Sequence, residues 1–221
     1  MLGKSEILCM EANSKTTPAW EPNIINGPML NLIQRLSLGP YNPRLQIITF
    51  IAARPQEGTS TIAREYAQTL AAETSQKILL IDAGTQLRGH SMPGIVDNIM
   101  AGKPPHDAVR LVQGFSTAYW IGSEKNRSAS GQVIHDADFW KALSVSFDTI
   151  IIDAPSLQSK FDGVGLAAKA DAAVLVIEAE ETPEPVIKNL RDTLTGAGAN
   201  IAGLVMNKRR YHIPHKVYAR L

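Results

Sequence analysis

The stretch Leu45-Gln-Ile-Ile-Thr-Phe-Ile-Ala-Ala-Arg-Pro-Gln-Glu-Gly58-Thr59-Ser60-Thr61-Ile-Ala63 decides the fold of this chain of 221 residues. It opens with an apolar, β-branched run, passes through a turn-prone segment and continues into residues that favour a helix. A strand, a loop and a helix in this order form the setting of a phosphate-binding P-loop. We therefore expect a strand over residues 47–52 and a helix over residues 60–73, joined by that loop.

The loop keeps only part of the P-loop pattern, which requires a Gly, four free positions and then Gly-Lys-Ser/Thr. In this register Gly58 is the second glycine, Thr59 takes the lysine position and Ser60 takes the hydroxyl position. Gly58 readily adopts the positive φ that turns N–H groups inward, and the following helix start offers N–H groups to an anion. Ser60 stands where a hydroxyl ligates Mg²⁺, whereas Thr59 has no ammonium group for the phosphates. The sequence therefore keeps the backbone N–H groups of the loop and of the helix start that would surround a phosphate, which we call the cradle. It lacks the lysine ammonium that would neutralise the phosphate charge.

The composition fits one globular α/β domain with a full core, because 44% of the residues are hydrophobic. The net charge of +1 gives no reason to expect a nucleic-acid partner or an anionic membrane surface. Cys9 is the single cysteine, so an internal disulfide is excluded and a reducing compartment is expected. Neither a signal-peptide pattern nor an apolar run of about 18 residues is present. We expect a cytoplasmic protein.

Strand and helix patterns alternate along the rest of the chain. Strands are expected at 77–82, 119–121, 148–153, 172–177 and 201–207, and helices at 29–36, 94–100, 138–146, 163–169 and 184–194, with a polar loop at 122–131. In the first helix, Leu30, Ile33 and Leu36 are expected on one face. The alternation predicts a mostly parallel sheet with helices on both faces. We divide the chain into an arm with a short helix (1–40), a P-loop NTPase-like domain (41–210) and a tail (211–221).

Polar residues follow several of the expected strands. The P-loop follows the first strand, and Asp82, Asp153 and Asn207 end three others. Ligands of such sheets bind beyond the carboxyl ends of the strands. These residues are therefore predicted to converge on one site.

Five segments match one family in their order along the chain. They are Ala-Arg-Pro-Gln-Glu-Gly-Thr-Ser-Thr (53–61), Ile-Leu-Leu-Ile-Asp-Ala (78–83), Pro-Gly-Ile-Val-Asp-Asn-Ile-Met-Ala-Gly (93–102), Ile-Ile-Ile-Asp-Ala-Pro (150–155) and the strand patterns within 170–207. They resemble the Walker motifs and last third of the bacterial tyrosine kinases (BY-kinases) of capsule and exopolysaccharide assembly, within the MinD/ParA group of P-loop ATPases. The resemblance spans about residues 45–208 and implies the P-loop NTPase fold.

The resemblance also implies roles for the converging residues. Asp153 would hold Mg²⁺ through a water, as Walker B carboxylates do, with Ser60 as the other metal-site residue. Asp82 would act as the base toward an attacking hydroxyl, and Asn207 would contact the adenine edge. The nucleotide, ATP or ADP, would be bound by Asn207 and by five residues of the loop and helix start: Arg54, Gly58, Thr59, Ser60 and Thr61. The implied partner is a membrane polysaccharide co-polymerase or export protein.

The chain departs from the family at catalytic positions. Thr59 replaces the Walker A lysine, and Gly84 stands where the family has the second Asp of Ile-Asp-Ala-Asp. The acidic and basic residues of the oligomerisation motif Glu-x-x-Arg-x-x-Arg are missing at the aligned positions (Pro28, Asn31 and Gln34), and the tail carries Tyr211 and Tyr218 in place of a tyrosine cluster. We therefore do not expect autophosphorylation in a ring of like subunits, although another homo-oligomer is compatible with the sequence.

Several residues also have structural interpretations. Asp153 and Asp82 can be strand-end carboxylates without present activity, and Asn207 can be a turn residue. Arg54 can supply the charge that Thr59 lacks, but the family pattern already has an Arg there beside its lysine. Lys208-Arg-Arg and His212-x-x-His215 are interpreted as a solvated end of the chain, and Trp120 and Trp140 as core residues.

Three functions stay open on these residues. The first is a degenerate, weakly active or non-catalytic relative of the BY-kinases that regulates a membrane polysaccharide protein. The second is an active ATP-dependent tyrosine kinase or ATPase whose rearranged site uses Arg54 or a partner's basic residue. The third, ranked last, is a MinD/ParA-like positioning ATPase, because that group's extra lysine near the start of the loop is absent.

Overall fold

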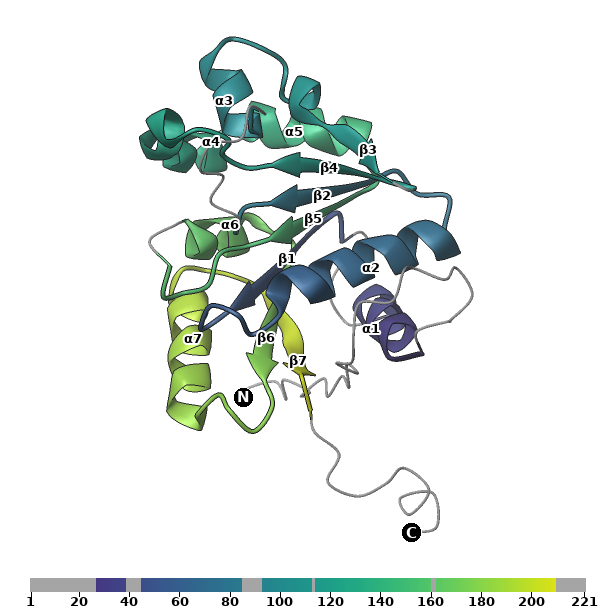
Figure 1. The fold of residues 1–221 in the computed structure, drawn as a ribbon, viewed down its shortest axis with the longest axis vertical. Helices are drawn as coiled ribbons and strands as arrows, with labels where there is room; N and C mark the ends of the chain where they lie inside the picture. Colours follow the sequence, from purple (N-terminus) through teal and green to yellow (C-terminus); the bar gives the residue numbers. More distant parts are fainter. Residues whose placement is uncertain (1–26, 39–44, 85–92, 113, 160–161, 210–221) are drawn as a thin grey trace.

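A single seven-stranded sheet, in the order β3-β4-β2-β5-β1-β6-β7, forms the centre of the molecule (Figure 1). The computed structural model describes residues 27–38, 45–84, 93–112, 114–159 and 162–209. The strands are β1 (Ile47–Ala52), β2 (Ile78–Asp82), β3 (Arg110–Val112), β4 (Phe115–Tyr119), β5 (Thr149–Asp153), β6 (Ala172–Glu178) and β7 (Ile201–Asn207). Among the described residues, β3 runs antiparallel to its neighbour, β4, and the other neighbouring strands pair in parallel. The predicted α/β class with a mostly parallel sheet is confirmed.

Helices cover both faces of the sheet. They are α1 (Gly27–Leu38), α2 (Thr59–Glu73), α3 (Ile95–Met100), α4 (Ser130–His135), α5 (Ala137–Ser146), α6 (Gly163–Lys169) and α7 (Glu184–Gly196), with 3₁₀-helices η1 (Pro105–Ala108) and η2 (Glu124–Ala129). One core layer packs α1 and α2 on the sheet, and the other packs α3 to α7 on the opposite face. β1 and β5 are buried at every position, as expected for central parallel strands whose sequences are mostly apolar.

The predicted elements are largely confirmed, with three corrections. The strand expected at 119–121 is wrong, because the strand is β4, which ends at Tyr119, and β3 beside it was not predicted. β4 alternates small polar residues with apolar ones, so its hydrophobic signal is weak. The polar loop expected at 122–131 instead contains η2 and the start of α4.

The buried face of α1 also differs from the expectation. Met29, Leu32 and Leu36 are 3% exposed or less, whereas Leu30 and Ile33 are only partly buried. This helix has apolar residues on more than one face, and its packing against α2 selects which face is buried. The interpretation of Trp120 and Trp140 as core residues is confirmed, since both are buried and stack with ring centroids 5.9 Å apart.

Asp97 on α3 organises the segment that follows β4. Its carboxylate accepts hydrogen bonds from the backbone N–H groups of Gly94 (2.8 Å), Gly122 (2.6 Å) and Ser123 (3.0 Å), and from the side chains of Ser123 and Asn126. Burial alone would raise the pKa of Asp97, but these hydrogen bonds outweigh it and hold the pKa below its usual range. Asp97 thereby fixes the carboxyl end of β4, next to the strand that carries Asp82.

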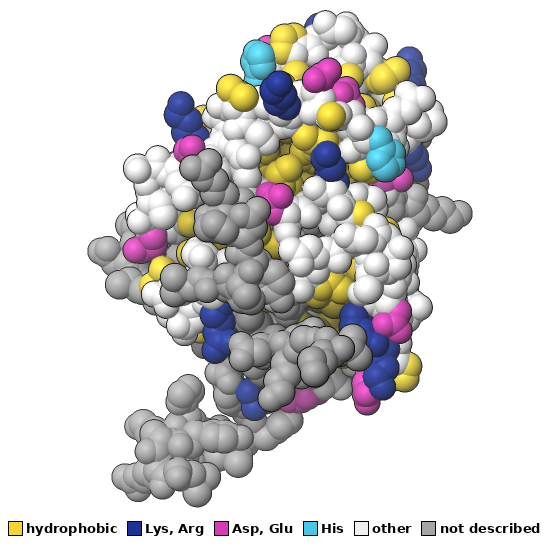
Figure 2. Space-filling view, turned by 180° about the vertical axis from the view of Figure 1, so that it is seen from behind, with side chains coloured by type: hydrophobic (Ala, Val, Ile, Leu, Met, Phe, Trp, Pro, Cys, Tyr) yellow, Lys and Arg dark blue, Asp and Glu magenta, His cyan; other side chains and the backbone are white. Residues whose placement is uncertain are grey.

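Some expectations concern residues outside the described ranges. These are the N-terminal arm up to residue 26, Cys9, the break at 39–44, and the tail with Tyr211, His212, His215 and Tyr218. The division into arm, domain and tail stays a prediction. Among the described residues, no helix is both long and apolar enough to cross a membrane. On the face shown in Figure 2, basic and acidic side chains of the described residues are intermixed.

Candidate functional site

The loop between β1 and α2 has a left-handed backbone at two positions. Gln56 has φ of 68° and Gly58 has φ of 97°. A Cβ atom at Gly58 would lie 1.9 Å from the Asn207 side-chain nitrogen, so only glycine fits there. The positive φ predicted for Gly58 is present, and the loop packs closely against the end of β7.

The start of α2 suits an anion. Thr59 is the first helical residue and is 8% exposed, whereas Ser60 and Thr61 are exposed. No side chain caps this helix, and its first turn contains no acidic residue. The positive end of a 15-residue helix is therefore left for a group such as a phosphate. The residues present fit a nucleotide's phosphates in this respect, apart from the missing ammonium group.

Two carboxylates lie side by side next to this helix start. β2 and β5 are neighbours, and Asp82 is the register partner of Asp153 at their carboxyl ends. Ser60, on α2, forms a side-chain hydrogen bond with Asp153. The predicted convergence of the P-loop, Asp82, Asp153 and Asn207 is therefore present in the fold.

The environment of Asp153 raises the pKa of its carboxyl group well above the usual range. The residue is 4% exposed, and this burial is the largest influence on its pKa. The Ser60 hydrogen bond opposes the effect, the negative charge of Asp82 adds to it, and the positive charge of Arg64 opposes it. The result is a pKa raised to about 7. A buried carboxylate in this state would be stabilised in its charged form by a bound cation.

The donor set at this point fits Mg²⁺, which prefers oxygen ligands and retains several waters. Ser60 and Asp153 would hold the ion together with the oxygens of a bound phosphate, and Asp82 lies beside them. The described residues contain no group of three or more His, Cys, Asp or Glu arranged to hold a metal by themselves.

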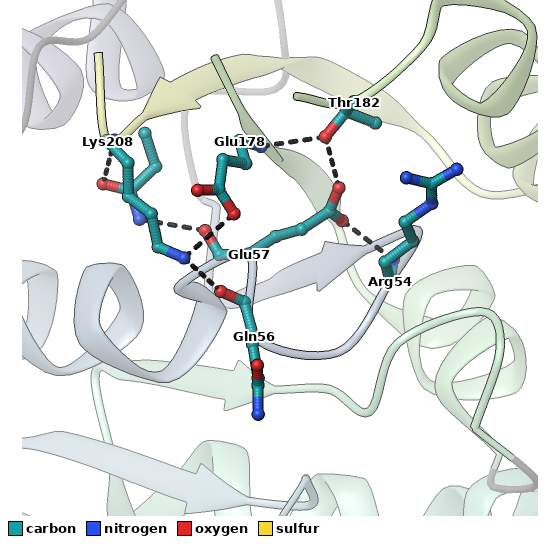
Figure 3. Close-up of polar contacts among 7 residues, drawn as sticks. Arg54, Gln56, Glu57, Glu178, Thr182 and Lys208 are labelled. Carbon is teal, nitrogen blue, oxygen red and sulfur yellow. Dashed lines mark hydrogen bonds and ion pairs between the residues drawn. The ribbon is translucent and has the colours of Figure 1, made fainter. Parts of the chain in front are cut away.

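Residues at the ends of β6 and β7 hold the outer side of the P-loop; we call Glu178, Thr182, Asn207 and Lys208 the loop clasp (Figure 3). The Lys208 ammonium donates to the Gln56 carbonyl at 2.6 Å and pairs with the Glu178 carboxylate at 2.9 Å. The Asn207 side-chain nitrogen donates to the Glu57 carbonyl at 2.9 Å. Two backbone carbonyls of the loop are thereby fixed by side chains distant in sequence.

Glu57 completes the clasp from within the loop. Its side chain is buried, with one oxygen accepting the Arg54 backbone N–H at 2.8 Å and the other accepting the Thr182 hydroxyl. The Thr182 hydroxyl also accepts the backbone N–H of Glu178 at 3.1 Å. The buried carboxylate thus closes the loop on itself and ties it to the segment after β6.

Two of the predicted nucleotide-binding residues, Arg54 and Asn207, differ in their hydrogen bonding. Arg54 is half-buried, and among the described residues its Nε atom has no hydrogen-bond partner. Figure 3 shows its guanidinium on the other side of Glu57 from Lys208. The Asn207 amide is engaged at both ends, with its oxygen accepting the Lys208 backbone N–H at 2.9 Å. Its predicted contact with adenine stays a prediction.

Sequence reasoning missed part of the site. The interpretation of Lys208 as part of a solvated end is wrong, because its ammonium binds the P-loop and Glu178. Glu57, Thr182 and Glu178 were not singled out. Glu57 is the residue in the sequence that could have indicated these contacts. An acidic side chain within a phosphate-binding loop needs hydrogen-bond donors from elsewhere in the protein if it is buried.

The clasp predicts a stability effect of Thr182→Val. This change keeps the side-chain shape but removes the hydroxyl donor of the buried Glu57 carboxylate, so the free energy of unfolding should fall by about 1–3 kcal/mol. Urea unfolding measures the effect, and hydrogen exchange at the Arg54 amide should become faster. Thr195→Val, at an exposed position of α7, is the matched control and should change stability little. Equal effects of the two variants would contradict the role of the clasp.

Asp153 predicts a pH dependence of stability. Its pKa is raised from 3.8 to about 7, so between these values the folded protein keeps a proton that the unfolded chain releases. The associated stability is fully present below about pH 4 and is lost as the pH rises through about 7, by at most about 4 kcal/mol.

Asp153→Asn should remove this dependence and be more stable than the natural protein at pH 8. Urea unfolding at pH 5 and pH 8 tests the expectation, with Asp107→Asn as the exposed control. If the natural protein and Asp153→Asn lost the same stability over this interval, Asp153 would not be the responsible group.

Comparison with known proteins relates the chain to polysaccharide biosynthesis. No protein-family model matches the chain. It is 24% identical over 175 residues to the succinoglycan biosynthesis transport protein ExoP of Rhizobium meliloti (strain 1021), a match that covers 74% of this chain and 22% of ExoP. It is 33% identical over 72 residues to the putative tyrosine-protein kinase CapB of Staphylococcus aureus, which covers 33% of this chain and 32% of CapB. The matches thus span less than half of either relative.

Solved structures share the fold over most of the chain. The chimerical protein CapA2B2 superimposes with a TM-score of 0.77 at 17% identity, covering 94% of this chain and 96% of that one. The kinase domain of the Escherichia coli tyrosine kinase ETK gives 0.72 at 17% identity, covering 95% and 93%. The septum site-determining protein MinD of Pyrococcus horikoshii, complexed with Mg-ADP, gives 0.60 at 19% identity, covering 79% and 76%. The resemblance predicted from the sequence is confirmed: the chain is similar to ExoP and CapB in sequence, and it has the MinD/ParA-type P-loop fold that these kinase structures share.

Proposed function

We propose that the chain is a degenerate relative of the polysaccharide tyrosine kinases, which binds nucleotide in its P-loop but transfers phosphate slowly or not at all. It would act by regulating a membrane protein of polysaccharide chain length or export. The observation that carries the proposal is Thr59, which lies buried at the first position of α2 inside an otherwise preserved cradle.

Having Thr59 in place of a lysine should weaken nucleotide binding less than it slows phosphoryl transfer. Losing one charge-assisted contact to a phosphate weakens binding by roughly 1.5–3 kcal/mol, about 10- to 100-fold. Losing a preorganised electrostatic donor costs a transition state roughly 100- to 1,000-fold in rate. Helix-end N–H groups, Ser60 and Asp153 remain to hold a nucleotide with Mg²⁺, so affinity can survive while turnover does not.

Gly84 supports the same conclusion. A Cβ atom at this position would lie 3.8 Å from an Asp153 carboxylate oxygen, in ordinary contact. An aspartate there would therefore belong to the carboxylate group formed by Asp82 and Asp153. When bound, ATP would supply the phosphoryl group. Asp82 alone would be left to orient an acceptor hydroxyl or take up its proton, beside Asp153, whose pKa is raised to about 7.

The proposed partner follows from the relatives. ExoP is named for transport in succinoglycan biosynthesis and CapB as a putative tyrosine kinase. We infer that this chain works in a comparable polysaccharide system, on the cytoplasmic side, and is held near the membrane through a partner protein. Nucleotide binding would then act as a conformational signal to that partner.

The proposal predicts binding without efficient transfer. In calorimetric titrations the natural protein should bind Mg-ADP and Mg-ATP, and Asp153→Ala should weaken the Mg²⁺-dependent part. In assays with γ-labelled ATP and a tyrosine-containing polymer, transfer should be at background level. The double variant Thr59→Lys/Gly84→Asp should raise transfer by at least about 100-fold, because it restores the charge and the acid.

Ala72→Lys/Gly84→Asp is the matched control, since it adds the same charges but places the ammonium at an exposed position near the far end of α2. Steady tyrosine phosphorylation by the natural protein, abolished in Asp153→Ala, would contradict the proposal. If Arg54→Ala also abolished that activity, the site would be an active kinase that uses Arg54 as its cation.

A further inference from the structure

Three described cations near the P-loop are candidates for the charge that position 59 lacks. Lys208 is engaged on the outer side of the loop by the Gln56 carbonyl and the Glu178 carboxylate. Arg54 lies on the other side of Glu57 from Lys208, with its Nε atom buried. Arg64 lies on α2, the helix whose first turn faces the cradle. Of the three, Arg64 is on the same element as Ser60.

The position of Arg64 on α2 directs its side chain toward the site. Arg64 follows Ser60 by four residues, and residues so spaced lie on one face of a helix. Helical side chains tilt toward the N-terminus, so the Arg64 side chain extends over the turn that contains Ser60. That turn rises about 5.4 Å, a distance that an extended arginine can span. Ser60 in turn is hydrogen-bonded to Asp153.

The charges around the site support a role of Arg64 in binding an anion. Asp82 and Asp153 are register partners at the carboxyl ends of β2 and β5, so two carboxylates lie side by side near the start of α2. The positive charge of Arg64 acts on Asp153, in opposition to burial and to Asp82. Arg64 is also exposed, so its guanidinium is accessible to a ligand that enters from solvent. A cation on the protein would offset the repulsion between these carboxylates and an incoming anion, in addition to any bound Mg²⁺.

We propose that Arg64 is a phosphate-binding residue of this site and supplies from the second turn of α2 the positive charge that a lysine at position 59 would provide. Its planar guanidinium can donate two parallel hydrogen bonds to phosphate oxygens, which a threonine cannot do. The inference rests on the proposed function, because it requires a polyphosphate in the cradle.

Titration of five proteins with Mg-ADP and with inorganic pyrophosphate tests the inference. Arg64→Ala should weaken both affinities by about 10- to 100-fold, and Arg64→Lys should keep part of the affinity. Adding Thr59→Lys to Arg64→Ala should restore binding, which a merely structural role of Arg64 would not allow. Arg35→Ala is the matched control and should bind like the natural protein. Arg35 is an exposed arginine of α1, beside Leu36, which lies near Gln76 and Asp148 at the opposite edge of the sheet.

The outcomes separate the two proposals. If the natural protein binds both ligands and Arg64→Ala binds them equally well, the role of Arg64 is refuted and the proposed function stands. If the natural protein binds neither ligand at millimolar concentration, both fail. Thermal unfolding should show Arg64→Ala to be folded, because Arg64 is exposed. If it does not fold, Arg64→Gln keeps most of the side chain and carries the same test.

Discussion

The hydrogen bond from the Asn207 side chain to the Glu57 carbonyl joins the last strand of the sheet to its first loop, and the site depends on it. The loop contains left-handed residues on both sides of Glu57, and at Gln56, which is not a glycine, this conformation persists only where the surroundings determine it. Asn207 and the other residues of the loop clasp provide those surroundings from the ends of β6 and β7. Because these contacts come from the protein itself, the loop is positioned before any ligand arrives. Preorganisation of this kind lowers the cost of binding.

The second constraint on the site comes from the two carboxylates beside the start of α2. Two neighbouring strands end in Asp82 and Asp153, and Asp153 is buried enough to have a pKa of about 7. Such a pair is compatible with an anionic ligand only when cations accompany it. In the related kinases a Walker A lysine is one of them, and here the buried Thr59 stands in its place. Under the function proposed above, the same fold would keep a nucleotide site and lose the electrostatic part of phosphoryl transfer, so that its role would be nucleotide binding.

The sequence predicted the elements whose signal is local. β1, α6 and β7 were predicted with the boundaries that the structure has, because the strands are mostly apolar and turn-forming residues lie near the ends of all three. Convergence at one edge of the sheet followed from strand direction alone. β3 and β4 were missed or displaced because their exposed or alternating residues give little hydrophobic signal. The clasp could not be predicted, since Thr182 and Lys208 lie 125 and 152 residues from their partners in the loop. Arg64 was missed because the P-loop motif ends before the second turn of α2.

A crystal structure of the protein grown with ADP and Mg²⁺ would test the central claim, that a preformed and clasped loop still binds the phosphates of a nucleotide. We expect density for ADP with its phosphates over the first turn of α2 and the metal near Ser60 and Asp153. The bonds from Asn207 to Glu57 and from Lys208 to Gln56 should be unchanged from those described above. Crystals without nucleotide in the cradle, or a loop that binds it only after these two bonds have broken, would contradict the account.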